Sequence, residues 1–132
     1  MEHGEMLRLK NMLLIDANYI LRYLLNDNEQ QAEEARKIIE TENVEILIEV
    51  LAEVMYVLEG VYEIERNKAC EGIIKLINYN NVSIKNEKVV KSALKIYSNK
   101  KIDFIDTILC AYNHEENRIV KTFDKKLNKL LN

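Results

Sequence analysis

Two aspartates follow short apolar segments of the chain. Asp16 comes directly after residues 12–15, and Asp124 comes a few residues after 118–120. Apolar runs of this length are typical of buried strands. In parallel sheets, ligands bind beyond the carboxyl ends of the strands, so both carboxylates are candidates for a functional site.

Further acids lie on segments with helical patterning. The helix expected over 103–115 is apolar almost all round, and it carries Asp103 and Asp106 on its one polar strip. Glu49 and Glu53 lie one turn apart on an earlier helix whose opposite face is apolar. A carboxylate held on a mostly buried helix costs free energy unless it is paired, hydrogen-bonded or bound to a metal.

A cluster of such acids has a defined chemistry. Carboxylates that converge repel one another unless a cation lies between them, and oxygen ligands favour hard cations such as Mg²⁺ or Mn²⁺. Divalent ions in a site of this kind activate water for attack on phosphorus and stabilise the leaving oxygen. The acids therefore indicate metal-dependent hydrolysis of phosphodiesters.

Each acid also has a simpler interpretation. An Asp near the end of a strand more often caps a helix or lies on the surface than takes part in catalysis. Asp103 stands where the N-cap of its helix is expected, although it could both cap the helix and bind metal. Four other glutamates are interpreted as solvated helix charges: Glu49, Glu59, Glu63 and Glu65.

Other catalytic classes find little support. His114 lies near the end of a helix, where a contact with the helix dipole is expected, and no Ser-His-Asp or Cys-His arrangement is indicated. Cys70 and Cys110 are far apart and are expected to be reduced, partly buried thiols. With only three glycines and no proline, the chain cannot form the glycine-rich phosphate loops of nucleotide-binding proteins.

Length and charge agree with a small enzyme. The 132 residues suit one domain, expected over 12–132, after a polar N-terminal tail over 1–11. The net charge of −3 argues against nonspecific nucleic-acid binding, but not against a nuclease, because bound cations supply the positive charge that meets phosphate. No apolar run resembles a signal peptide or a membrane span, so a cytoplasmic protein without a membrane partner is expected.

Short strands alternate with helices along the chain. This order predicts an α/β sandwich built on a parallel sheet. The expected strands are 12–15, 44–48, 82–84 and 118–120, the last of them buried. The expected helices cover about 19–24, ending at a break over 26–28, then 29–40, 49–62, 66–77, 87–97 and 103–115, with a basic helix after Asp124.

Four segments resemble the motifs of PIN-domain ribonucleases, in particular the VapC-type toxins of bacteria and archaea. They follow in the family's order and at compatible spacing, and the resemblance covers the chain from Met12 to its end. The segments are Leu14–Leu24 (LIDANYILRYL), Leu51–Leu58 (LAEVMYVL), Asp103–Leu109 (DFIDTIL) and Val120–Leu127 (VKTFDKKL).

The resemblance assigns roles to individual residues. The register of the second motif selects Glu53 over Glu49, and the apolar pair after the third acid selects Asp106 over Asp103, which remains a candidate additional acid. Asn18 and Thr122 are implied as groups that position the substrate or the ligands, with packing as the alternative role. The metal-binding and catalytic acids that the resemblance implies are Asp16, Glu53, Asp106 and Asp124.

The resemblance also implies an architecture and partners. It implies a three-layer α/β/α sandwich, a homodimer, an RNA substrate, and a cognate antitoxin that places a basic side chain among the acids. An RNA-processing nuclease outside a toxin–antitoxin pair and a non-catalytic binding module remain alternatives. A phosphatase with Asp16 as nucleophile is disfavoured, because Asn18 stands where such enzymes need a second acid. Lysines near Asp124 either form a solvated face or contact RNA: Lys121, Lys125, Lys126 and Lys129.

Overall fold

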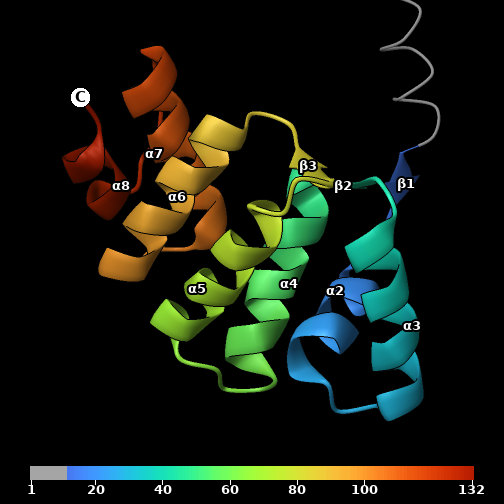
Figure 1. The fold of residues 1–132 in the computed structure, drawn as a ribbon. Coiled ribbons are helices and arrows are strands. Elements are labelled where there is room, and N and C mark those ends of the chain that lie inside the picture. Colours follow the sequence, from blue (N-terminus) through green and yellow to red (C-terminus); the bar gives the residue numbers. More distant parts are fainter. Residues whose placement is uncertain (1–11) are drawn as a thin grey trace, which may run out of the picture. The chain divides into compact units, whose positions relative to one another are not determined.

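The computed structural model describes residues 12–132, and the expected tail over 1–11 lies outside the described residues. Three strands, all in one parallel sheet, and seven helices alternate along the described chain (Figure 1). The predicted α/β class with a parallel sheet is therefore confirmed. The elements are, in chain order, β1 (Leu13–Leu14), α2 (Ala17–Leu25), α3 (Glu29–Thr41), β2 (Val44–Ile46), α4 (Ile48–Gly60), α5 (Arg66–Ile77), β3 (Val82–Ile84), α6 (Glu87–Asn99), α7 (Phe104–Glu116) and α8 (Lys125–Leu130).

The chain folds as two compact units. Among the described residues, the sheet unit comprises residues 12–54 together with Lys75–Lys85, and it holds the three strands with α2 and α3. The helical unit comprises Met55–Ile74 and Asn86–Asn132, and it holds α6, α7 and α8. The boundary between the units falls within α4 and again within α5, so both helices contribute residues to each unit.

In the sheet unit, β2 lies between β1 and β3. Val44 of β2 is aligned with Leu13 on one side and with Val82 on the other. Val44 and Ile46 are buried, as expected for the middle strand of a parallel sheet. The predicted strand over 82–84 is confirmed, and the one over 44–48 is shorter than predicted because α4 begins at Ile48.

The first strand differs from the prediction of a buried segment over 12–15. Only two residues pair with β2, and Leu13 and Leu14 are 40% and 62% exposed. Ile15, which follows the strand, is buried. The reason is that β1 is an edge of the described three-stranded sheet, so no strand covers its outer side.

The helices of the sheet unit pack through small and branched side chains. α2 and α3 lie side by side, with Ile20 and Leu21 buried on α2 and Ala32, Ala35 and Ile39 buried on α3. Alanines on α3 allow close approach of the two helices. The predicted break after α2 is confirmed, because the chain turns into the left-handed region at φ 53° at the C-cap.

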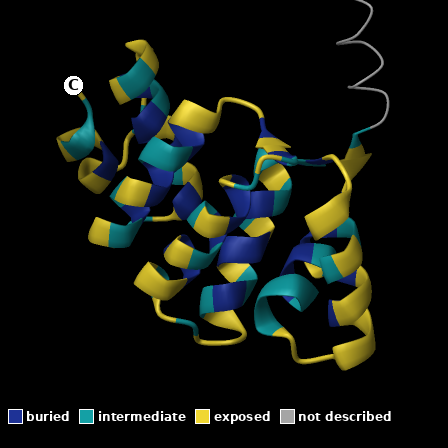
Figure 2. Ribbon diagram, in the orientation of Figure 1, coloured by how far each residue is buried: buried dark blue, intermediate teal, exposed yellow. Residues whose placement is uncertain are grey.

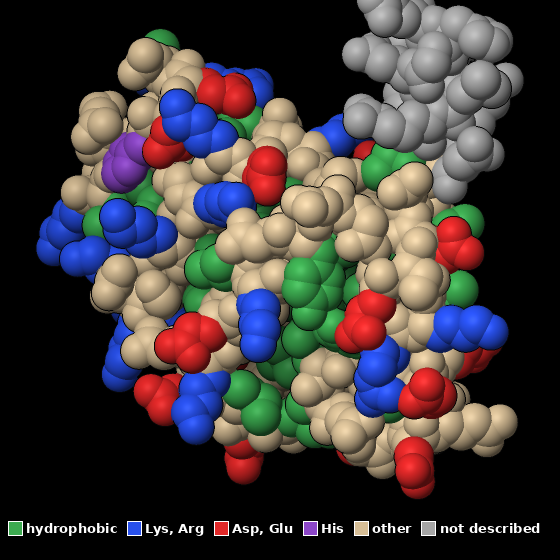
Figure 3. Space-filling model, in the orientation of Figure 1, with side chains coloured by type: hydrophobic (Ala, Val, Ile, Leu, Met, Phe, Trp, Pro, Cys, Tyr) green, Lys and Arg blue, Asp and Glu red, His purple; other side chains and the backbone are tan. Residues whose placement is uncertain are grey.

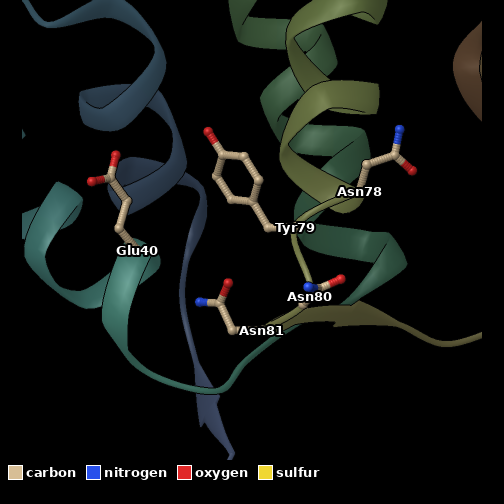
Figure 4. Close-up of a pocket in the computed structure, with 5 residues that line it drawn as sticks. All are labelled: Glu40, Asn78, Tyr79, Asn80 and Asn81. Carbon is tan, nitrogen blue, oxygen red and sulfur yellow. The ribbon is translucent and has the colours of Figure 1, made fainter.

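A polar network joins α2 and α3 to the loop before β3; Figure 4 shows its members Glu40 on α3 and Tyr79 and Asn81 on the loop. The Tyr23 hydroxyl lies 2.8 Å from the Tyr79 hydroxyl and donates to Glu40 over 3.1 Å. Burial raises the pKa of Tyr23 above its usual range, and the bonds to Tyr79 and Glu40 add to the shift. The Asn81 amide donates to the main-chain oxygen of Ile39 over 2.6 Å. These bonds fix the loop that leads into β3.

In the helical unit, α6 and α7 pack against each other. Buried residues on the two helices face a shared core, and exposed residues cover the outer sides (Figure 2). The rings of Tyr97 on α6 and Phe104 on α7 meet edge to face, with their centres 5.4 Å apart. Ala93 and Ala111 are buried and leave room for the helices to approach.

The predicted buried strand over 118–120 is wrong. The structure has no strand there, and Ile119 is 82% exposed. A strand needs a neighbour for its main-chain groups, and the described part of the helical unit contains no strand for this segment to pair with. The Asn113 amide instead donates to the main-chain oxygen of Arg118 over 2.8 Å.

Among residues 12–132, none of the helices combines the length and the apolar character needed to cross a membrane.

Candidate active site

Asp16 lies at the carboxyl end of β1, as predicted, and it also caps α2. Its backbone is extended, and one carboxylate oxygen accepts a hydrogen bond of 3.0 Å from the Tyr19 amide. The side chain is exposed, and the second oxygen makes no hydrogen bond to the described residues. Asp16 can therefore cap the helix with one oxygen and bind a cation with the other.

Glu53 lies on the part of α4 that belongs to the sheet unit. Its side chain is exposed, as is that of Glu49 one turn earlier, while Leu51 and Val54 are buried on the opposite side. Neither glutamate forms an ion pair with the described residues. Asn18, in the first turn of α2, is also exposed. These polar side chains are therefore free to meet a ligand.

Three acids of the helical unit interact electrostatically. Burial raises the pKa of Asp106, and the negative charges of Asp103 and Asp124 raise it further. Asp103 is the N-cap residue of α7, but its side chain makes no capping hydrogen bond. The expectation of a capping position is confirmed, whereas the capping bond itself is absent, so the Asp103 carboxylate is available to a cation.

Asp124 is positioned by local hydrogen bonds. It is the N-cap residue of α8, and one carboxylate oxygen accepts a bond of 2.9 Å from the Leu127 amide. The Thr122 hydroxyl accepts a bond of 3.0 Å from the Asp124 amide, and the Asn128 side chain donates to the Thr122 main-chain oxygen over 2.9 Å. Thr122 therefore holds the backbone of the residue that bears the acid.

The predicted site residues divide between the two units. Asp103, Asp106 and Asp124 lie near one another in the helical unit, and Asp16, Asn18 and Glu53 belong to the sheet unit. Within the described residues, no three Asp, Glu, His or Cys side chains form a ready-made metal cage. The donor set still fits a divalent cation, because a positive charge beside Asp106 would offset the repulsion that raises its pKa.

Glu59 forms a part-buried ion pair with Arg66, so the interpretation of Glu59 as a solvated charge is wrong. The Glu59 carboxylate accepts a bond of 2.8 Å from the Arg66 Nε and a hydrogen bond from the Tyr97 hydroxyl. The Arg66 guanidinium lies 3.7 Å from the centre of the Tyr97 ring. One signal was present: Arg66 begins a helix, where the dipole disfavours a cation that has no partner.

Arg66 also holds the connection between α6 and α7. Its Nη1 donates to the main-chain oxygens of Lys100 over 2.7 Å and of Ile102 over 2.9 Å, and it lies 3.5 Å from that of Tyr97. These carbonyls immediately precede Asp103 in the chain. The arginine therefore fixes the segment that delivers the acids of α7.

The cysteines are poor nucleophiles in this fold. Burial raises the pKa of the Cys70 thiol to about 11. Cys110 lies 3.5 Å from the His114 Nε2, a contact that sequence analysis missed. That nitrogen lies 2.6 Å from the Leu130 main-chain oxygen, and a carbonyl can only accept, so Nε2 must donate. His114 cannot then take the Cys110 proton through Nε2, and the pair is structural.

The structure agrees with both interpretations of the basic residues near Asp124, a solvated face and a surface that contacts RNA. Lys121, Lys125, Lys126 and Lys129 are all exposed, and the last three belong to α8. Lys and Arg side chains gather over this helix on the face drawn in Figure 3. Exposure of this kind suits a solvated face and a surface for RNA phosphates equally.

The chain matches a known protein family. The family described as PIN domain matches residues 13–130, which run from the first residue of β1 to the last residue of α8. All seven predicted site residues lie inside the matched region. No curated protein and no solved structure was found to match.

Proposed function

Because the chain belongs to the PIN-domain family, whose members are typically nucleases, we propose that it is a metal-dependent endoribonuclease and the toxin of a type II toxin–antitoxin pair. The observation that carries the enzymatic part is the group of three carboxylates in the helical unit. Asp106 is half-buried, and burial together with the negative charges of Asp103 and Asp124 raises its pKa, a repulsion that a bound cation would relieve.

The cofactor is proposed to be Mg²⁺ or Mn²⁺. The residues proposed to hold it are Asp16, Glu53, Asp106 and Asp124, with Asp103 as an additional acid. When bound, a divalent ion supplies the charge that activates water and stabilises the leaving oxygen of a phosphodiester.

The chain's own groups would orient the substrate and the acids. The bonds of Thr122 set the position of Asp124, and the Tyr19 amide sets that of Asp16. The exposed amide of Asn18 is proposed to hydrogen-bond the RNA near the scissile phosphate.

Cleavage of host total RNA tests the enzymatic proposal. We expect discrete fragments with Mg²⁺ or Mn²⁺, no fragments with EDTA, and a loss of at least about 100-fold in rate for Asp106→Asn or Glu53→Gln. Glu49→Gln is the matched control, because Glu49 is an exposed glutamate one turn away on the same helix, and it should cleave normally. Full activity in Asp106→Asn would refute the proposal, and metal binding without any cleavage would instead favour a binding module.

The proposed role as a toxin needs a separate test. Expression of the wild type in bacteria should arrest growth, and expression of Asp106→Asn should not. Co-expression with the product of a small neighbouring reading frame should restore growth and yield a complex, and light scattering should find the free chain as a homodimer. Specific cleavage without growth arrest or a partner would instead indicate an RNA-processing nuclease.

A further inference from the structure

A pocket of about 500 Å³ opens beside the acids of the helical unit. It is lined by the first turn of α5, the end of α6 and the connection that leads to Asp103. Asp103 belongs both to this lining and to the charge cluster around Asp106. The pocket therefore adjoins the place where a scissile phosphate would meet the acids, and its volume lies in the range of small-ligand sites.

Two lysines at this pocket carry unpaired positive charge. Lys100 and Lys101 both line it, both are exposed, and neither forms an ion pair with the described residues. The charge of Arg66, the third cation of the lining, is already matched by Glu59. The lysines therefore offer ammonium groups to an anion beside a group of carboxylates, in a chain whose net charge is −3.

The pocket is also held in shape by bonds to the main chain. Arg66 fixes the Lys100 and Ile102 carbonyls, as described above. The Ser98 hydroxyl and the Asn99 amide each donate to the Lys95 main-chain oxygen over 2.9 Å. A pre-formed wall of this kind lowers the entropy cost of binding. Asn67, in contrast, has an exposed amide with no hydrogen bond to the described residues, so it can read a base edge.

We propose that this pocket is a subsite for an RNA nucleotide next to the scissile bond, with Lys100 and Lys101 on its phosphate and Asn67 on its base. The proposal rests on the proposed nuclease function and deepens it. RNA is the occupant because a nucleotide in the pocket places the neighbouring phosphodiester beside Asp103 and Asp106. Phosphate contacts of this kind position the strand, and a single amide adds a limited sequence preference.

Binding of a labelled single-stranded RNA tests the subsite. The probe is a mixed-sequence RNA of about 12 nucleotides, and fluorescence anisotropy is followed across a salt series. All variants carry Asp106→Asn, so that cleavage does not disturb the equilibrium. Lys100→Ala/Lys101→Ala should weaken binding at least about fivefold and reduce the slope of log affinity against log salt by about 0.7, because the contacts to one phosphate are lost.

The matched control is Lys88→Ala/Lys91→Ala. It removes the same charge from the same unit, at the other end of α6 from the pocket. We expect less than a twofold change for this control, and near wild-type affinity for Lys100→Arg/Lys101→Arg. Equal losses in the two alanine pairs would overturn the subsite, because binding would then follow net charge alone, and so would no loss in either pair.

This test separates the subsite from the nuclease activity. The subsite is measured by binding to a protein that does not cleave, whereas the nuclease proposal is measured by cleavage in the wild type. If the wild type cleaves RNA and the Lys100/Lys101 pair changes neither affinity nor KM, the subsite fails and the nuclease stands. If the wild type cleaves nothing, the nuclease fails, and a loss of affinity confined to Lys100→Ala/Lys101→Ala still supports an RNA site in this pocket.

Discussion

Asp103 is the N-cap residue of the helix in which Asp106 is the third residue, yet the Asp103 carboxylate makes no capping hydrogen bond and instead raises the pKa of Asp106. An aspartate at an N-cap normally bonds the amide of the second or third residue of the helix. Here the Asp103 carboxylate bonds no helix amide, and its negative charge acts on Asp106. Repulsion between the two carboxylates costs the folded protein a small amount of free energy. A cation that binds both carboxylates would remove that cost.

The first prediction concerns stability without metal. A raised pKa means that folded Asp106 holds its proton to a higher pH than the unfolded chain does. The contribution of Asp106 to the stability of the folded protein is therefore present at low pH, where its carboxyl is protonated. This contribution is lost as the pH rises through the raised pKa. Asp106→Asn in EDTA should raise the melting temperature at neutral pH by about 1–3 °C, and the gain should vanish at acidic pH.

Thermal unfolding across pH measures this effect. Glu49→Gln provides the control, since Glu49 has no described partner and its melting temperature should match the wild type. A lower melting temperature for Asp106→Asn at neutral pH would contradict the prediction, because the carboxylate would then be stabilising.

The second prediction concerns the Arg66 cluster. Arg66→Ala would remove the ion pair of the Glu59 carboxylate and the hydrogen bonds of two main-chain oxygens. The free energy of unfolding should therefore fall by about 2–4 kcal/mol. Arg66→Lys should lose about half as much, because an ammonium cannot reproduce the planar fork or the stacking on Tyr97.

Urea unfolding with an unchanged m-value gives the free energies for this comparison. Arg36→Ala is the control, because the Arg36–Glu33 pair is exposed on one helix and its loss should cost less than about 0.5 kcal/mol. Equal costs for Arg66→Ala and Arg36→Ala would show that the Arg66 contacts add no stability.

The third prediction separates the two roles of Asp16. Asparagine caps helices as well as aspartate does, so Asp16→Asn should retain the bond to the Tyr19 amide and lose only a few tenths of a kcal/mol through the helix dipole. Asp16→Ala should lose about 1 kcal/mol of stability. Both variants should lose affinity for Mn²⁺, as measured by calorimetric titration. If Asp16→Asn is as unstable as Asp16→Ala, the capping bond is not the source of stability.

Local patterns predicted most of the helices and strands. Helical spacing placed α5 over its observed residues, and the Asn-rich break after α2 was visible because asparagine readily adopts left-handed backbone. The apolar pattern wrongly predicted a buried strand over 118–120 and a buried segment at β1. An apolar run shows that a segment can be buried, but not whether a partner strand lies beside it, as exposed Ile119 and Leu14 demonstrate.

The acids were predictable from position, whereas the residues that support them were not. Asp16 and Asp124 follow apolar segments and prove to be helix caps, so the simple interpretation as caps and the proposed metal role apply to the same residues. Glu59 resembled a surface charge because its partners, seven and 38 residues away, lie on other helices. Contacts of that range depend on how helices pack.

Mn²⁺ binding to the wild type, Asp16→Asn, Asp106→Asn and Glu49→Gln tests the central claim most directly. Asp16 and Asp106 are both proposed ligands of the cation, so its binding should weaken in either variant. We predict a fall in affinity of at least about tenfold for Asp16→Asn and for Asp106→Asn, and no change for Glu49→Gln. Equal affinity in all four proteins would contradict the proposed site.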